Sequence, residues 1–132
     1  MQKPKPTAGL RHVALFVQQF AECVFFYKEL LGMQIDWQPD EDNIYLTSGN
    51  DNLALHRAKP EFNPAPHQRL DHIGFIIAEI DEVDVWYEYL KAKNVQMKTA
   101  PRTHRDDARS FYCLDPDGNT VQIIYIPTIK HS

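Results

Sequence analysis

Cysteine is scarce in this sequence, where Cys23 and Cys113 are the only two among 132 residues. They stand far apart, in segments that we expect to form a helix and a strand, which indicates two buried thiols rather than a disulfide framework. Long apolar runs are missing as well. No stretch approaches the roughly 20 apolar residues of a membrane-spanning helix, and residues 1–9 lack the apolar core of a secretory signal. We therefore expect a cytoplasmic protein without a membrane partner.

An excess of positive charge is also absent, because 14 basic residues stand against 18 acidic ones and give a net charge of −4. The basic residues form no stripe, which argues against a nucleic acid as a partner. What is present is a composition typical of a globular protein, with 43% apolar and 24% charged residues. The chain has the length of one ordinary domain.

The most informative feature of the sequence is an internal repeat. The stretch "LRHVALFV" begins at Leu10, and "LDHIGFII" begins at Leu70. An ungapped comparison of residues 10–30 with residues 70–90 gives five identities in 21 positions, where average composition predicts about one. The stretches "SGNDNLALH" and "DGNTVQIIY" extend the repeat, and three prolines lie between its halves in residues 58–69.

The repeat predicts a loose tail over 1–9 and a single domain over 10–127, made of a module at 10–57, a linker at 58–69 and a module at 70–127. Hydrophobic periodicity and turn signals predict one helix and four strands in each module. The helices are expected at 20–32, with Gly32 ending the first in a left-handed conformation, and at 81–92. The strands are expected at 11–17, 34–38, 43–48 and 52–57, then at 71–77, 95–99, 109–114 and 120–126.

Side chains alternate between the two faces of a strand, so the sequence also predicts which residues leave the helix-covered face of each sheet. In the first strand the apolar row that begins at Val13 suits packing against the helix, which puts His12 on the opposite, open face. The same reasoning assigns His56, His72 and Gln122 to open faces. If the open faces of the two sheets curve toward each other, these four side chains converge in a central cavity.

These stretches resemble the vicinal oxygen chelate superfamily, which includes glyoxalase I, bleomycin-resistance proteins and extradiol dioxygenases. The matching segments are "LRHVALFV", "FFYKELLGM", "LDHIGFII" and "FYCLDPDGNTVQII", and the similarity extends from Leu10 to Pro127. The resemblance implies an α+β fold of two tandem βαβββ modules whose curved mixed sheets enclose a central cavity. It does not identify a reaction, because one scaffold of this kind hosts many chemistries.

The resemblance also implies ligand positions for a divalent metal such as Zn, Ni, Fe or Mn. His12 and His72 match the ligand of the first strand in each module. Gln122, just after "DPDGN", stands where the second module usually has a metal-binding Glu, and Ala54 stands at the equivalent position of the first module. Because alanine cannot bind metal, His56, two residues further along the same face, is a candidate replacement. Imidazole and carbonyl donors suit these metals, although the amide lacks the charge of a carboxylate.

Further residues are predicted to contact a small-molecule substrate. Tyr45 and Tyr112 fall on the open faces if their strands keep the same parity, where they either donate hydrogen bonds or form cavity walls. Phe16 and Trp37 supply an apolar lining. The loop at 101–110 contains Arg105 and Arg109, and its equivalent in this fold class overhangs the cavity, where either arginine can pair with an anionic group. We expect the remaining histidines to be solvated: His67, His104 and His131.

Two functions stay open at this point. The first is a metal-dependent enzyme of the lyase or isomerase type acting on a small oxygenated substrate. Gln122 cannot act as the detachable metal-bound base of glyoxalase chemistry, and a dioxygenase is less favoured because a carboxylate ligand is missing. The alternative is a metal-free small-molecule binding protein of the bleomycin-resistance type, and an inactive regulatory domain is a third possibility. We expect a homodimer, because twofold dimers are the commonest soluble oligomers, with the cavity formed within one chain or across two.

Overall fold

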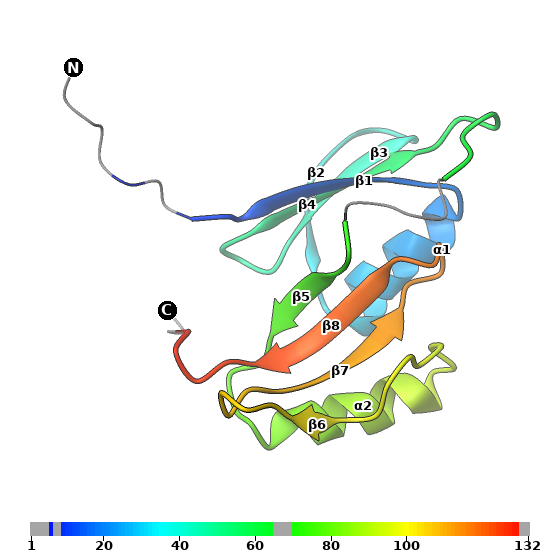
Figure 1. Cartoon of the computed structure of the whole chain (residues 1–132). Helices are drawn as coiled ribbons and strands as arrows, with labels where there is room; N and C mark the ends of the chain where they lie inside the picture. Colours follow the sequence, from blue (N-terminus) through cyan, green and yellow to red (C-terminus); the bar gives the residue numbers. More distant parts are fainter. Residues whose placement is uncertain (1–5, 7–8, 65–69, 130–132) are drawn as a thin grey trace. The chain divides into compact units, whose positions relative to one another are not determined.

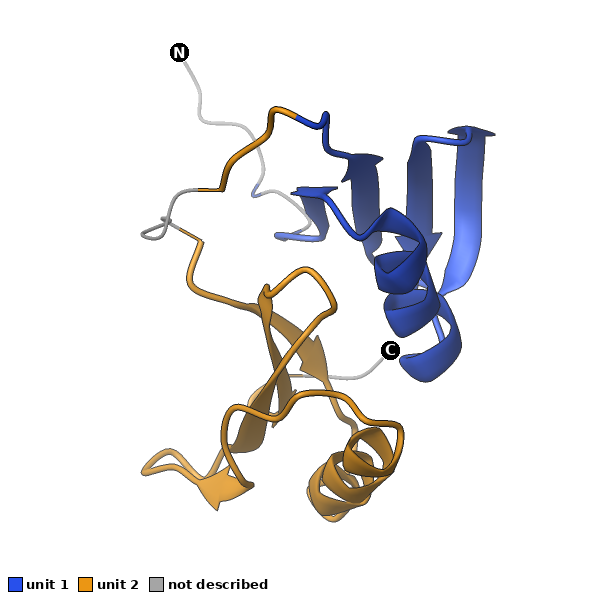
Figure 2. Cartoon of the chain, turned by 90° about the vertical axis from the view of Figure 1, so that its right-hand side faces the viewer, with its two compact units in different colours: residues 1–60 blue, residues 61–132 orange. Residues whose placement is uncertain are grey.

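The computed structural model describes residue 6, residues 9–64 and residues 70–129. The chain forms two compact units, Met1–Pro60 and Glu61–Ser132 (Figure 2), and the division falls in the proline-rich segment between the halves of the repeat. Most of the expected tail and residues 65–69 of the expected linker lie outside the described residues. None of the helices in the described ranges is long and apolar enough to cross a lipid bilayer.

Unit 1 begins with strand β1 (His12–Val17), followed by helix α1 (Phe20–Val24) and the π-helical segment η1 (Phe25–Leu30). Its remaining strands are β2 (Gln34–Asp40), β3 (Asn43–Thr47) and β4 (Asn52–Arg57). They form a four-stranded sheet in the order β1-β4-β3-β2, in which β1 is parallel to β4 and the other pairs are antiparallel (Figure 1).

The helical part of unit 1 packs against the sheet through one row of apolar side chains. Leu15 of β1 and Leu55 of β4 are buried, together with Phe26 and Tyr27 of η1. The expected single helix widens in its second half, because the backbone N–H of Leu31 donates to the carbonyl of Phe26 five residues earlier. Gly32 follows with φ = 82°, so the left-handed end of the helix is confirmed.

Unit 2 repeats this arrangement with β5 (Ile73–Ile76), α2 (Glu82–Ala92), β6 (Arg102–Thr103), β7 (Arg109–Leu114) and β8 (Thr120–Tyr125). The sheet order is β5-β8-β7-β6, with β5 parallel to β8. Figure 1 shows α2 lying along one face of this sheet, where Leu90 of α2 and Phe111 of β7 are fully buried. The expected α+β fold of two tandem modules is therefore confirmed, and each sheet is open rather than closed into a barrel.

The strand expected at 95–99 is wrong in position. Met97 makes only an isolated bridge to Cys113, and regular pairing with β7 begins at β6. The backbone N–H groups of Lys98 and Thr99 both donate to the carbonyl of Tyr112. Two consecutive donors on one acceptor break the alternation that a ladder needs, as in a β-bulge.

The turn before β8 is built by the side chain of Asp115, which is 3% exposed. One of its carboxylate oxygens accepts hydrogen bonds from the backbone N–H groups of Asp117 and Asn119, and the other accepts from the Asn119 side chain. Gly118 has φ = 90°, a left-handed conformation that glycine adopts without strain. The turn thus fixes where β8 begins, and with it the face on which Gln122 lies.

Both cysteines are free and buried, as the sequence predicted. Burial raises the pKa of the Cys113 thiol to about 12. The thiol of Cys113 is therefore protonated at neutral pH and has no nucleophilic or metal-binding character there.

Candidate metal and substrate site

His12 begins β1 on the open face of the unit 1 sheet, where it is exposed. Its Nδ1 lies 2.8 Å from Oδ1 of Asn52, the residue opposite it in the strand register. The Asn52 amide is fixed in this orientation because its Nδ2 donates to the carboxylate of Asp36 at 3.1 Å. Nδ1 of His12 is therefore the donor, and in the neutral ring Nε2 is the acceptor, the arrangement typical of a metal-binding histidine.

His72 shows the same arrangement in unit 2 with a different partner. Its Nδ1 lies 2.7 Å from a carboxylate oxygen of Asp71. Because a carboxylate only accepts, Nδ1 is the donor, and in the neutral ring Nε2 is again the acceptor. The hydrogen bond with His72 lowers the pKa of the Asp71 carboxyl below its usual value. The imidazole ring stands edge-on to Tyr112, with ring centroids 5.3 Å apart.

Gln122 lies on the open face of β8 and is 8% exposed. Its Nε2 donates to the hydroxyl oxygens of Ser110 and Tyr112, each at 3.1 Å. The carbonyl oxygen points the other way, toward β5, where a Cβ built on Gly74 would lie 3.9 Å from Oε1. Unit 2 therefore brings His72, Tyr112 and Gln122 together, with the amide nitrogen occupied and the oxygen turned toward the strand that follows His72.

His56 does not meet His12 within unit 1. The parallel register of β1 and β4 places His56 opposite Phe16, four residues beyond His12, which corresponds to about 13 Å along the strand. Each ring is also tied to the residue opposite it, since Nδ1 of His56 lies 2.6 Å from Oδ1 of Asn43. His56 lies on the open face, as expected. Within unit 1, however, it is too far from His12 to replace the ligand that is missing at Ala54.

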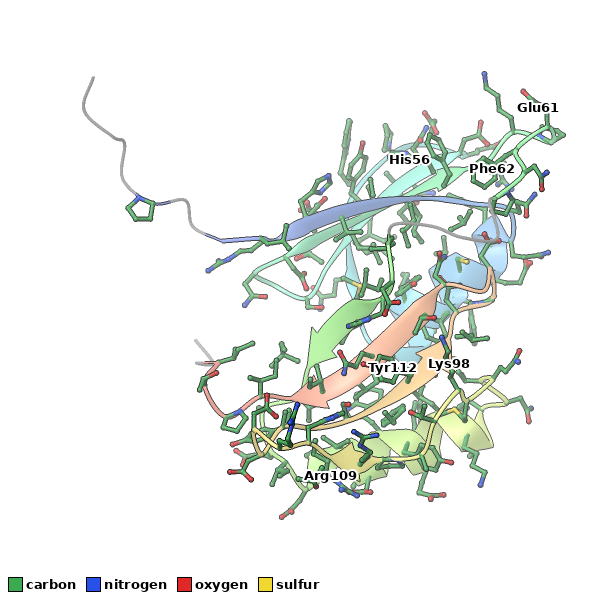
Figure 3. The ribbon with its side chains drawn as sticks, viewed as in Figure 1. His56, Glu61, Phe62, Lys98, Arg109 and Tyr112 are labelled. Atoms are coloured by element: carbon green, nitrogen blue, oxygen red, sulfur yellow. The ribbon has the colours of Figure 1, made fainter. Side chains whose placement is uncertain are left out.

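His56 belongs instead to a row of aromatic side chains on the open face of unit 1. Its ring lies 5.7 Å from that of Phe16 and 5.9 Å from that of Tyr45. Trp37 stacks on Tyr45 at 5.1 Å and is 58% exposed. Phe16 and His56 also line an open hollow of about 490 Å³ at this end of the sheet; His56 is labelled in Figure 3. Phe16, Tyr45 and Trp37, all predicted to contact substrate, thus belong to one row of neighbouring rings.

Arg109, which the sequence predicted to contact substrate, lies on the helix-facing side of β7. Its guanidinium forms two hydrogen bonds with the carboxylate of Asp84 in α2, at 2.8 and 2.9 Å, and a third with Thr103. Figure 3 places Arg109 beside α2, away from Tyr112. Three positions separate the two residues, so they have opposite parity and cannot share a face.

The Asp84–Arg109 pair should make a small, pH-dependent contribution to stability. Hydrogen bonds from Arg109 lower the pKa of the Asp84 carboxyl, so the stabilisation exists above the unfolded-state pKa of about 3.9 and is lost as the pH falls through the lower folded-state value. Both side chains are partly exposed, and Asp84→Asn is expected to lower the free energy of unfolding by less than about 1 kcal/mol at pH 7. Urea denaturation at pH 7 and pH 3 measures this.

Asp81→Asn is the matched control, because Asp81 stands at the start of the same helix and makes no side-chain capping bond. Its unfolding curves should follow those of the unmodified chain at both pH values. A deficit of Asp84→Asn that is equally large at pH 3 would contradict the assigned ion pair.

Several residues that orient the predicted donors were not predicted from the sequence. Asn52 and Asp36 hold His12, and Ser110 holds Gln122. Parity alone could have placed Ser110 next to Tyr112 on the open face. His104 was expected to be solvated, but it is half-buried and its Nε2 lies 2.8 Å from the Ser110 hydroxyl. His67 and His131 lie outside the described residues.

Comparison with known proteins gives a family and several relatives. The family model described as "Glyoxalase/Bleomycin resistance protein/Dioxygenase superfamily" matches residues 9–123. Metallothiol transferase FosB of Staphylococcus haemolyticus is 29% identical over 115 residues, covering 87% of this chain and 81% of the relative. Glutathione transferase FosA of Serratia marcescens is 29% identical over 119 residues, covering 87% and 79%.

Solved structures agree on the fold. The crystal structure of lactoylglutathione lyase from Agrobacterium tumefaciens superimposes with a TM-score of 0.74 at 19% identity, covering 92% of this chain and 96% of that one. The duplicated β-sheet module, its open faces and the extent of the family match lead to one conclusion. The chain belongs to the glyoxalase/bleomycin resistance protein/dioxygenase superfamily.

Proposed function

We propose that this chain is a divalent-metal-dependent enzyme acting on a small oxygenated substrate, with His12, His72 and Gln122 as metal ligands. The observation that carries the proposal is the orientation of these three side chains. Each imidazole uses Nδ1 for a hydrogen bond within the protein, so Nε2 is the nitrogen that remains for a ligand. The Gln122 amide uses its nitrogen in the same way, so its oxygen remains. Three side chains that are each held by a hydrogen bond, and that each keep one acceptor atom for a ligand, suit a cation.

The donor set fits a metal of the Zn, Ni, Fe or Mn type, because two imidazoles and one amide oxygen are ligands that these ions accept. No group of three His, Cys, Asp or Glu residues that could hold an ion occurs in the described ranges, and the proposed set accordingly includes an amide oxygen. All three donors are neutral. A bound ion would keep its full positive charge, which weakens its retention but makes it a strong Lewis acid toward a substrate oxygen.

The residues around Gln122 favour transfer or addition over isomerisation. The open face of β7 and β8 carries Ser110, Tyr112, Gln122 and Ile124, none of which is a carboxylate able to abstract a proton from carbon at neutral pH. Tyr112 accepts a hydrogen bond from Gln122, which leaves its own O–H to donate to a substrate oxygen. The relatives FosB and FosA are named as a metallothiol transferase and a glutathione transferase, in keeping with this preference.

Metal content is the direct test of the proposal. The protein is purified without an affinity tag and reconstituted with a mixture of divalent metals. Elemental analysis by inductively coupled plasma mass spectrometry should then find about one equivalent of a transition metal per chain. A metal content below about half an equivalent per chain would contradict the proposed metal dependence.

We also propose that the metal site is completed in a homodimer, with His12 from one chain and His72 with Gln122 from the other. Light scattering should then give about twice the chain mass of 15.4 kDa. An equimolar mixture of His12→Ala and His72→Ala chains, refolded together, should regain about a quarter of the sites, because half of the dimers are mixed and each mixed dimer has one intact site of two. A mass of one chain, or a mixture that stays without metal, would contradict a shared site.

A second candidate function is a metal-free small-molecule binding protein. The row of aromatic rings on unit 1 favours it, since Trp37, Tyr45 and Phe16 offer exposed or half-buried ring faces to a planar apolar ligand. In that case chelator-treated protein should bind its ligand as tightly as metal-loaded protein does. Quenching of tryptophan fluorescence on titration with aromatic compounds, with and without chelator, separates the two functions.

A further inference from the structure

A chain of hydrogen bonds runs from a loop to the Gln122 amide. His104 Nε2 lies 2.8 Å from the Ser110 hydroxyl, which in turn accepts from Gln122 Nε2 at 3.1 Å. The second proton of the amide nitrogen goes to the Tyr112 hydroxyl. Ser110 and Gln122 are almost fully buried, at 2% and 8% exposure. The contacts are therefore made away from water, where an unmatched donor is costly.

The partners of the amide nitrogen decide which end of the amide faces the site. Ser110 accepts a hydrogen bond from Gln122. The same hydroxyl contacts His104 Nε2, which either accepts its O–H or donates to its second lone pair. In both cases His104 holds the hydroxyl in place. With the amide nitrogen engaged by Ser110 and Tyr112, Oε1 is left on the side of β5.

The loop that carries His104 is itself fixed by backbone hydrogen bonds. The N–H of His104 donates to the carbonyl of Ala108 at 2.7 Å, and its carbonyl accepts from Asp107 at 3.0 Å. Asp107 has φ = 66°, which closes the loop tightly, and Asp106 accepts a hydrogen bond from the Ala108 N–H. This loop joins β6 to β7, and its hydrogen bonds hold the His104 imidazole beside Ser110.

We propose that His104 and Ser110 are positioning residues that hold Gln122 with its carbonyl oxygen presented and its NH₂ group withdrawn. Position 122 then offers an oxygen acceptor and takes a cation or a hydrogen-bond donor rather than an anion. The inference deepens the proposed function and rests on it where metal affinity is concerned. The orientation of the amide can be tested without any metal.

The test compares Ser110→Ala with Ser110→Thr, and His104→Phe with His104→Gln. Threonine keeps the hydroxyl, and glutamine keeps an acceptor near the position of Nε2, whereas alanine and phenylalanine remove these groups. In metal-free protein, the side-chain ¹H–¹⁵N signals of Gln122, assigned by their loss in Gln122→Glu, should shift in Ser110→Ala and His104→Phe. They should stay close to their original positions in the two conservative variants.

Competition with a chromophoric chelator then measures Zn²⁺ affinity. Ser110→Ala and His104→Phe should each weaken it by about tenfold or more, and the conservative variants by no more than about threefold, as expected for partners that orient a ligand. If the unmodified chain binds no Zn²⁺, the proposed function fails while the amide signals still report on the positioning. If all four variants keep the original amide signals, or if Ser110→Ala and His104→Phe keep full affinity in a chain that binds Zn²⁺, the positioning role is overturned.

Discussion

His12→Ala and His72→Ala should each lower the affinity of the protein for a divalent metal by at least about 100-fold, because loss of an orienting partner alone already costs about 10–100-fold. Both rings lie on open faces, where His12 is exposed and His72 is half-buried. Neither ring belongs to the apolar row that packs against a helix, so the free energy of unfolding should change by less than about 1 kcal/mol. The loss of affinity is thus expected without a loss of fold.

Chelator competition and elemental analysis measure the affinity, and urea denaturation of the metal-free proteins checks the fold. His56→Ala is the matched control, because His56 also lies on an open face and also uses Nδ1 in a hydrogen bond with an asparagine. It should keep the original affinity, since its place in the register separates it from His12. If both test variants retain the metal content of the unmodified chain, the ligand assignment is incorrect.

Gln122→Glu should strengthen metal binding by about tenfold, which corresponds to about 1.4 kcal/mol. The substitution replaces a neutral oxygen donor with a charged one of nearly the same shape. The carboxylate cannot donate to Ser110 and Tyr112 as the amide does, so both hydroxyls must turn and donate to it. That reversal changes the hydrogen bond between Ser110 and His104 and offsets part of the electrostatic gain.

Isothermal titration with Zn²⁺ and Mn²⁺ measures the change, and Gln122→Leu is the control that removes the oxygen donor. The expected order of affinity is Glu, then Gln, then Leu. Identical titrations for the three proteins would place residue 122 outside the metal site. A weaker Gln122→Glu site together with an unchanged melting temperature would show that the hydrogen bonds of the amide matter more than its missing charge.

The sequence by itself determined the repeat, and through it most of the fold. Side-chain alternation assigned His12 and Gln122 to open faces. This assignment is local, because it requires only that the residue lies in a β-strand. Buried rows such as the one containing Leu15 and Leu55 followed from the same rule. The left-handed turn at Gly32 was equally local, since it depends on the residue and its place after a helix.

Only the tertiary structure decided the register and the polar partners. His56 and His12 share a face, but the pairing of β1 with β4 places His56 opposite Phe16, and no local pattern encodes that offset. The Asp84–Arg109 pair joins residues 25 positions apart, and the hydrogen bond between His104 and Ser110 depends on how one loop folds back. These interactions are set by which strands and helices lie side by side, and that arrangement follows from packing of the whole unit rather than from any short segment.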